Sequence, residues 1–170
     1  SQGGVNGSIL YYEDDKIIAI HGKENIDTTS KGRLVCYRIP TEYPSGDKPI
    51  LLGEKDEVWR NDEHVSFSSS PVLHDDRVYS TIATGELLCV NGKTGETIWS
   101  LKLAPDQLHA SPLYADGKLY VPMADGKAFV VKPHDDHGEI LDEVDMGAVC
   151  LAAPSAYDGK VYIQTKEALH

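Results

Sequence analysis

The sequence lacks long hydrophobic runs: no apolar stretch approaches the roughly 20 residues that a membrane-spanning helix needs. It therefore predicts no transmembrane segment. The first residues, 1–7, are polar and glycine-rich and do not resemble a signal peptide. Basic residues are also few, with 16 Lys and Arg against 27 Asp and Glu and a formal net charge of −11. Because such a surface repels phosphate backbones, we expect no nucleic-acid partner.

Cysteine is scarce, and the three cysteines, Cys36, Cys89 and Cys150, lie far apart in the chain. No C-x-x-C pair exists, which excludes a local zinc or thioredoxin-like motif. No G-x-S-x-G elbow and no phosphate-binding glycine loop is present either. Cys36 and Cys89 occupy the same position of a sequence repeat, where a third copy has Val130. We therefore expect these cysteines to be buried as small apolar side chains.

A repeat of roughly 41 residues is the main feature that the sequence does contain. Each copy opens with Ser-Pro or Ala-Pro, continues through an Asp-Asp or Asp-Gly pair and ends in an apolar run with Tyr. This opening pattern is clear at residues 70–79, 111–120 and 153–162. A diverged copy begins near Gly7 and carries an insertion of roughly 20 residues, which we place within residues 21–31 and 40–49.

Each copy predicts four short strands joined by tight turns, because Asp-Gly and Asp-Asp pairs between apolar runs are hairpin signals. Helical periodicity is absent. The sequence therefore predicts an all-β fold, a β-propeller of four-stranded antiparallel blades, partial, with three complete blades plus part of a fourth. We expect one domain, residues 1–170, to be a segment of a larger propeller whose open edges favour self-association. The approximate blades are residues 6–60, 68–103, 109–147 and 151–170.

One segment, N-G-K-T-G-E-T-I-W from Asn91, resembles the tryptophan-docking motif of quinoprotein-like propellers. Asn91 stands for the Asp of that motif, while Thr94, Gly95 and Trp99 match it. Trp59 holds the equivalent fourth-strand place in the first copy. The resemblance implies that the indole packs between neighbouring blades, where a large flat ring fills a wedge-shaped gap. The first and third copies lose the Thr-Gly turn, and the third also loses the Trp.

The resemblance to PQQ-like repeats covers most of residues 8–170. It implies membership of one of two groups: quinone- and calcium-dependent dehydrogenases, or cofactor-free assembly factors. The enzymes are expected to show an adjacent Cys-Cys pair and a Trp beneath the quinone. Here no such pair exists, and both Trp residues hold packing positions.

We therefore expect a non-catalytic binding or scaffold module that holds no cofactor and binds a protein. By resemblance alone, the full-length protein would be periplasmic or extracellular. The alternatives are a fragment of a PQQ- and calcium-dependent dehydrogenase and, after that, a carbohydrate-binding propeller.

One polar cluster, His134, Asp135, Asp136 and His137, has residue types that bind divalent metal ions. The interpretation that we favour is a solvated turn between the third and fourth strands of the third blade, next to Pro133. We predict no catalytic, cofactor or metal site elsewhere. The insertions, residues 22–31 and 40–56, are the best places for specific recognition, since loops on rigid scaffolds carry function. His109 is a candidate for the propeller rim or channel.

Overall fold

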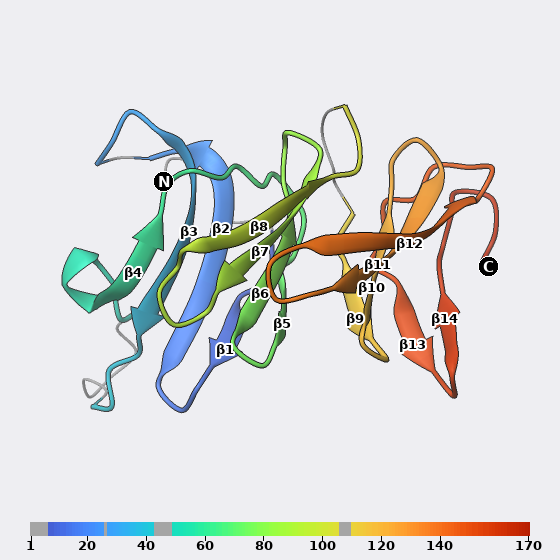
Figure 1. Ribbon diagram of the computed structural model, residues 1–170. Helices are drawn as coiled ribbons and strands as arrows, with labels where there is room; N and C mark the ends of the chain where they lie inside the picture. The colour runs from blue at the N-terminus through green and yellow to red at the C-terminus, as the bar shows by residue number, and fades with distance from the viewer. Residues whose placement is uncertain (1–6, 26, 43–48, 106–109) are drawn as a thin grey trace.

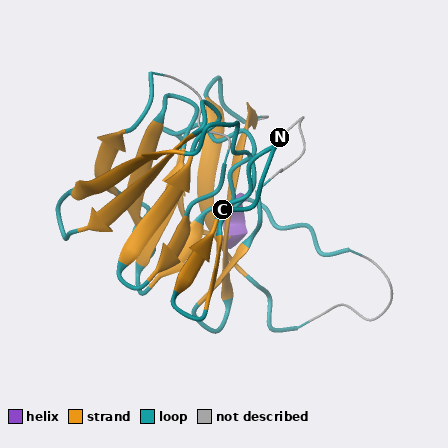
Figure 2. Cartoon of the chain, turned by 90° about the vertical axis from the view of Figure 1, so that its right-hand side faces the viewer, coloured by secondary structure: helices purple, strands orange, loops and turns teal. Residues whose placement is uncertain are grey.

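A computed structural model describes residues 7–25, 27–42, 49–105 and 110–170. It contains three four-stranded antiparallel sheets and one two-stranded sheet, which stand side by side along the chain (Figure 1). Within the described residues the single helical element is a 3₁₀ turn, Glu54–Asp56 (Figure 2). None of the helices in this part of the chain is long and apolar enough to span a membrane. The fold class is therefore confirmed: a partial propeller with three complete blades and part of a fourth.

The first blade contains strands β1 (Leu10–Tyr12), β2 (Lys16–Glu24), β3 (Lys31–Arg38) and β4 (Glu57–Asn61), paired in that order. The first insertion lies within residues 21–31, between the second and third strands, but part of it is strand and not loop. The β2–β3 ladder continues through the pairs His21–Arg33 and Glu24–Lys31. The insertion therefore lengthens a hairpin, because its backbone groups find partners across the ladder.

The second and third blades repeat this order, and their second and third strands are shorter than β2 and β3. The second blade contains β5 (Val72–His74), β6 (Arg77–Thr81), β7 (Glu86–Asn91) and β8 (Thr97–Lys102). The third blade contains β9 (Leu113–Ala115), β10 (Lys118–Pro122), β11 (Lys127–Pro133) and β12 (Gly138–Asp145). The partial blade contains β13 (Ser155–Tyr157) and β14 (Lys160–Tyr162), followed by an isolated bridge from Gln164 to Leu169.

The first hairpin turn of each blade places an acidic residue at positive φ. These residues are Asp75 (φ 51°), Asp116 (φ 49°) and Asp158 (φ 48°). Short polar side chains tolerate the left-handed region because they bond locally to the backbone. In the first blade this residue is Glu13 (φ 50°) and not the aligned Asp14, because its turn has one extra residue.

Two apolar clusters fill the spaces between neighbouring blades. The space between the first and second blades, called here the first junction, contains fully buried Leu34 and Leu88. The space between the second and third blades, the second junction, contains Tyr79, Leu119 and Val131. Since burying one such side chain stabilises the fold by about 1.5–3 kcal/mol, the blades depend on each other for stability.

A column of serines also joins successive blades. The backbone N–H of Ser8 donates to Ser70 Oγ at 2.9 Å, and the N–H of Ser70 donates to Ser111 Oγ at 2.8 Å. Each serine precedes the first strand of its blade. In the partial blade Ala153 holds this place and has no hydroxyl group to accept such a bond.

Candidate binding sites on the propeller

The turn between β7 and β8 is built by the side chain of Asn91. Its Oδ1 atom accepts hydrogen bonds from the backbone N–H groups of Lys93 at 2.8 Å and Thr94 at 3.2 Å. Gly95 then takes φ +78°, a conformation that other residues adopt at a cost. The matched motif residues therefore shape a tight turn whose backbone is exposed to the preceding blade.

Trp59 of the first blade docks on this turn. Its indole Nε1 donates to the carbonyl oxygen of Gly92 at 2.8 Å, and its ring lies against Gly95. Asn61 adds a bond from Nδ2 to the Gly95 carbonyl at 2.9 Å. The indole is 9% exposed, so it serves as packing between two blades. The motif residues of one blade thus receive the Trp of the blade before it.

Trp99 makes the same contact one blade further on. Its Nε1 donates to the carbonyl oxygen of His134 at 3.2 Å, and a Cβ at Gly138 would lie 3.1 Å from the ring. The turn after β11 therefore receives an indole although it lacks the Thr-Gly pair. Sequence reasoning missed this role, because the hydrogen bond uses a backbone carbonyl, which every residue has, and Gly138 stands outside any Thr-Gly pair.

The candidate metal ligands lie in this docking turn, with their side chains paired to different groups. His134 Nε2 lies 2.9 Å from Glu139 Oε2, and His137 Nδ1 lies 2.7 Å from Asp136 Oδ1. Asp135 Oδ1 pairs with Arg77 of the second blade at 2.8 Å. The described residues contain no group of three or more His, Cys, Asp or Glu side chains arranged to hold a metal ion. The arrangement favours a structural turn over a metal site, with hydrogen bonds to the second blade across the second junction.

The cysteines are free and buried. Cys36 pairs in register with Trp59, and Cys89 with Trp99, so both line the blade junctions. Burial raises the pKa of the Cys36 thiol to about 11 and also raises the pKa values of Cys89 and Cys150. Because the thiolate is the reactive form, these thiols are poor nucleophiles at neutral pH.

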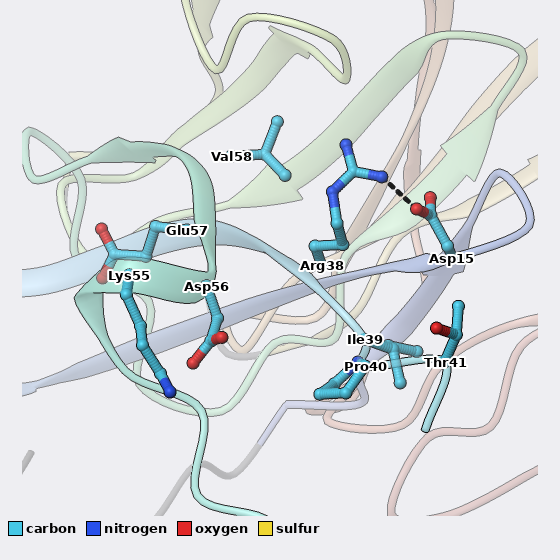
Figure 3. Close-up of a pocket in the computed structure, with 9 residues that line it drawn as sticks. All are labelled: Asp15, Arg38, Ile39, Pro40, Thr41, Lys55, Asp56, Glu57 and Val58. Carbon is cyan, nitrogen blue, oxygen red and sulfur yellow. Dashed lines mark hydrogen bonds and ion pairs between the residues drawn. The ribbon is translucent and has the colours of Figure 1, made fainter. Parts of the chain in front are cut away.

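The second insertion forms a pocket of about 390 Å³ on the first blade (Figure 3). The chain leaves β3 through Arg38 and enters β4 through Glu57, with both segments lining the pocket. The Arg38 guanidinium forms an ion pair with Asp15, whereas Lys55 has no ion pair among the described residues. The pocket lies where the other blades carry their docking turns, and its mixed charges suit a polar group.

An ion-pair network holds the first insertion against the first blade. Arg33 is 7% exposed and bonds to Asp27 at 2.9 Å and to Asp62 at 2.5 Å. Asp27 Oδ2 also accepts a hydrogen bond from Arg60 Nη1 at 2.9 Å. The Arg33 guanidinium, helped by Arg60, lowers the pKa of the Asp27 carboxyl to about 2. This part of the insertion is consequently attached to the sheet.

Parts of the predicted recognition sites lie outside the described residues. These are residues 26 and 43–48 of the insertions and the rim candidate His109.

A family model described as outer membrane protein assembly factor BamB matches residues 52–167, more than half of the chain. No sequence among curated proteins matches the chain significantly.

Solved structures also match the fold of this chain. The crystal structure of BamB from Moraxella catarrhalis matches with a TM-score of 0.62 at 13% identity, over 95% of this chain and 55% of that one. The chain thus spans about half the length of that protein. The computationally designed Ika4 protein matches with a TM-score of 0.68 at 18% identity, over 98% of this chain and 91% of that one.

Proposed function

The chain belongs to the family of outer membrane protein assembly factor BamB, and on that premise we propose that it is a non-catalytic module that binds polypeptides during outer-membrane protein assembly. The match over residues 52–167 carries this proposal. The proposal places the full-length protein in the periplasm, where such assembly factors meet their partners.

The geometry of the indoles supports a role without a cofactor. Trp59 and Trp99 are buried in the first and second junctions, where each donates its N–H to a backbone carbonyl. A ring used in this way is not free to form the floor of a quinone site. We therefore propose that neither PQQ nor calcium is part of the function of these blades.

A binding experiment tests the proposal. The purified chain is immobilised and exposed to a detergent-solubilised outer-membrane assembly complex, to an unfolded outer-membrane β-barrel protein diluted from urea, and to serum albumin as control. We expect saturable binding of at least one of the first two and none of albumin. Absence of binding to both would refute the proposal.

A second measurement addresses the dehydrogenase alternative. PQQ and calcium chloride are added to the chain, and the absorbance of bound quinone is followed after gel filtration. We expect no quinone to co-elute. Stoichiometric co-elution that depends on calcium would favour the enzyme over the binding module.

A further inference from the structure

The third junction, between the third blade and the partial blade, lacks the side chains that fill the other two. In the first junction Tyr12, the last residue of β1, donates its hydroxyl to Asp76 at 2.9 Å. In the second junction His74, the last residue of β5, stacks on Tyr114 with ring centroids 3.9 Å apart. The last residue of β9 is Ala115, whose side chain is too short for either contact.

The opposite wall of the third junction is truncated as well. Tyr114 is the middle residue of β9, and the middle residue of β13 is Ala156. The pair that meets as His74 and Tyr114 in the second junction is therefore Ala115 and Ala156 in the third. Where the second junction has two aromatic rings, the third junction has two methyl groups.

Tyr120 is left without the aromatic neighbours that its counterpart has. Tyr79, in the same position of the second blade, lies 6.0 Å from the Tyr114 ring and 5.9 Å from the Trp99 ring. Tyr79 is 2% exposed. Around Tyr120 the corresponding residues are Ala156 and Asp142, and Tyr120 is only half-buried.

A cleft of about 380 Å³ occupies the space of the missing rings. Its lining includes Ala115, Tyr120, Ala156, Tyr157 and Val161. An aromatic wall with a vacant stacking position is suited to a flat ring, which prefers an offset-stacked or edge-to-face partner.

We propose that this third-junction cleft binds an aromatic side chain of a partner polypeptide, which stacks on Tyr120 in the place that Tyr114 holds against Tyr79. The inference rests on the proposed polypeptide-binding function and names the group that is recognised.

The charges at the rim indicate which aromatic segments fit. Asp116, Asp158 and Lys160 line the cleft. Asp116 is paired with Lys118, whereas Asp158 has no ion pair among the described residues. The neighbouring strand β12 adds Asp142, Glu143 and Asp145 to a chain of net charge −11. Complementarity therefore favours a Trp or Tyr, whose ring carries a hydrogen-bond donor, next to Lys or Arg.

Short peptide probes test the proposal on the purified chain. Acetyl-Lys-Trp-amide, acetyl-Lys-Tyr-amide and acetyl-Lys-Leu-amide are titrated while ¹H–¹⁵N spectra are recorded. We expect the Trp and Tyr probes to shift the amide signals of Tyr120, Tyr157 and Val161 saturably. The Leu probe should bind at least about tenfold more weakly.

Substitutions assign the effect to the cleft. Ala156→Tyr restores the ring present at the same place in the second junction and should weaken binding of the Trp probe by at least about tenfold. Ala152→Tyr, at an exposed position outside the cleft, is the matched control and should leave it unchanged. Equal binding by wild type and Ala156→Tyr, with both folded by circular dichroism, would overturn the proposal. Equal affinity for the Leu and Trp probes would do so as well.

The two levels of inference fail separately. If the assembly complex or the unfolded barrel binds wild type and Ala156→Tyr equally, the cleft is not the recognition site and the binding function stands. If the Trp probe binds in the cleft and neither macromolecule binds the chain, the aromatic-binding cleft is supported and the proposed role in assembly is refuted.

Discussion

Gly95 of the second blade lies so close to Trp59 of the first that a Cβ atom at Gly95 would come 2.6 Å from the indole Cδ2 atom. The indole reaches this position because the turn offers only backbone. The first junction consequently depends on the absence of a side chain as much as on the presence of one.

Gly95→Ala should destabilise the chain strongly, because the new methyl group displaces the indole and the backbone holds φ +78°. We expect a loss of about 3 kcal/mol in the free energy of unfolding, measured by urea titration. The matched control is Gly117→Ala, which has a similar φ of +70° and no atom within 4 Å of its Cβ. Gly117→Ala should lower the free energy of unfolding by only about 1 kcal/mol, because the new methyl group adds backbone strain and no steric clash. Equal losses would contradict the docking argument.

Stability should fall above pH 9 because of the buried Cys36 thiol. Burial raises its pKa from 9.0 to about 11, so the unfolded chain releases this proton at a lower pH than the folded chain. The contribution of the protonated Cys36 thiol to stability is complete below pH 9 and is lost as the pH rises towards 11. Urea midpoints at about pH 8 and about pH 10.5 measure this loss.

Cys36→Val is the comparison, because Val130 occupies the equivalent place in the third blade. The variant should lose less stability over the same interval. Some loss will persist, since burial also raises the pKa values of Tyr12 and Tyr79. An unchanged slope in Cys36→Val would show that other groups account for the decline.

We expect no zinc binding at the docking turn that contains His134 and His137. The two imidazoles are paired with Glu139 and Asp136, and the neighbouring Asp135 is held by Arg77. Calorimetric titration with zinc chloride should therefore show no saturable binding at micromolar concentrations. Saturable binding that disappears in His134→Ala would establish the metal site instead.

The chain should self-associate through its open outer edge. Strand β12 is exposed along almost its whole length and presents Leu141 and Val144, which are 45% and 40% exposed. Sedimentation at increasing concentrations should show a rising mass. The double substitution Leu141→Lys, Val144→Lys should suppress the rise, whereas Thr29→Lys, in an exposed loop, should not. A concentration-independent monomer would contradict this prediction.

Much of the architecture could be predicted because local chemistry determines it. The Asp-Gly pairs at Asp116 and Asp158 form the hairpin turns that their residue types favour. The Asn91 to Trp99 segment contains the turn and the indole that the motif implies. These features depend on residues close together in sequence, so a repeat of known period is enough to place them.

The contacts across the junctions could not be predicted, since they join residues one repeat apart. The partner of Trp99 is a carbonyl group at His134, which every residue type possesses. Ala115 and Ala156 carry no signal as single residues. Their meaning appears only when the strand registers place them at the positions of His74 and Tyr114 and the structure shows that both line one cleft.

The backbone bonds of the serine column have a direction. The N–H groups of Ser8 and Ser70 donate to the serine hydroxyl of the next blade, although the Ser70 hydroxyl also donates back to Ser8. Trp59 and Trp99 likewise donate to the next blade, so each of these blades gains bonds to the one synthesised after it. We therefore expect that a blade leaving the ribosome gains these bonds only after about 40 further residues have emerged. Folding of a blade should then follow its synthesis by one repeat, and the face that contacts the next blade should be the last to be covered.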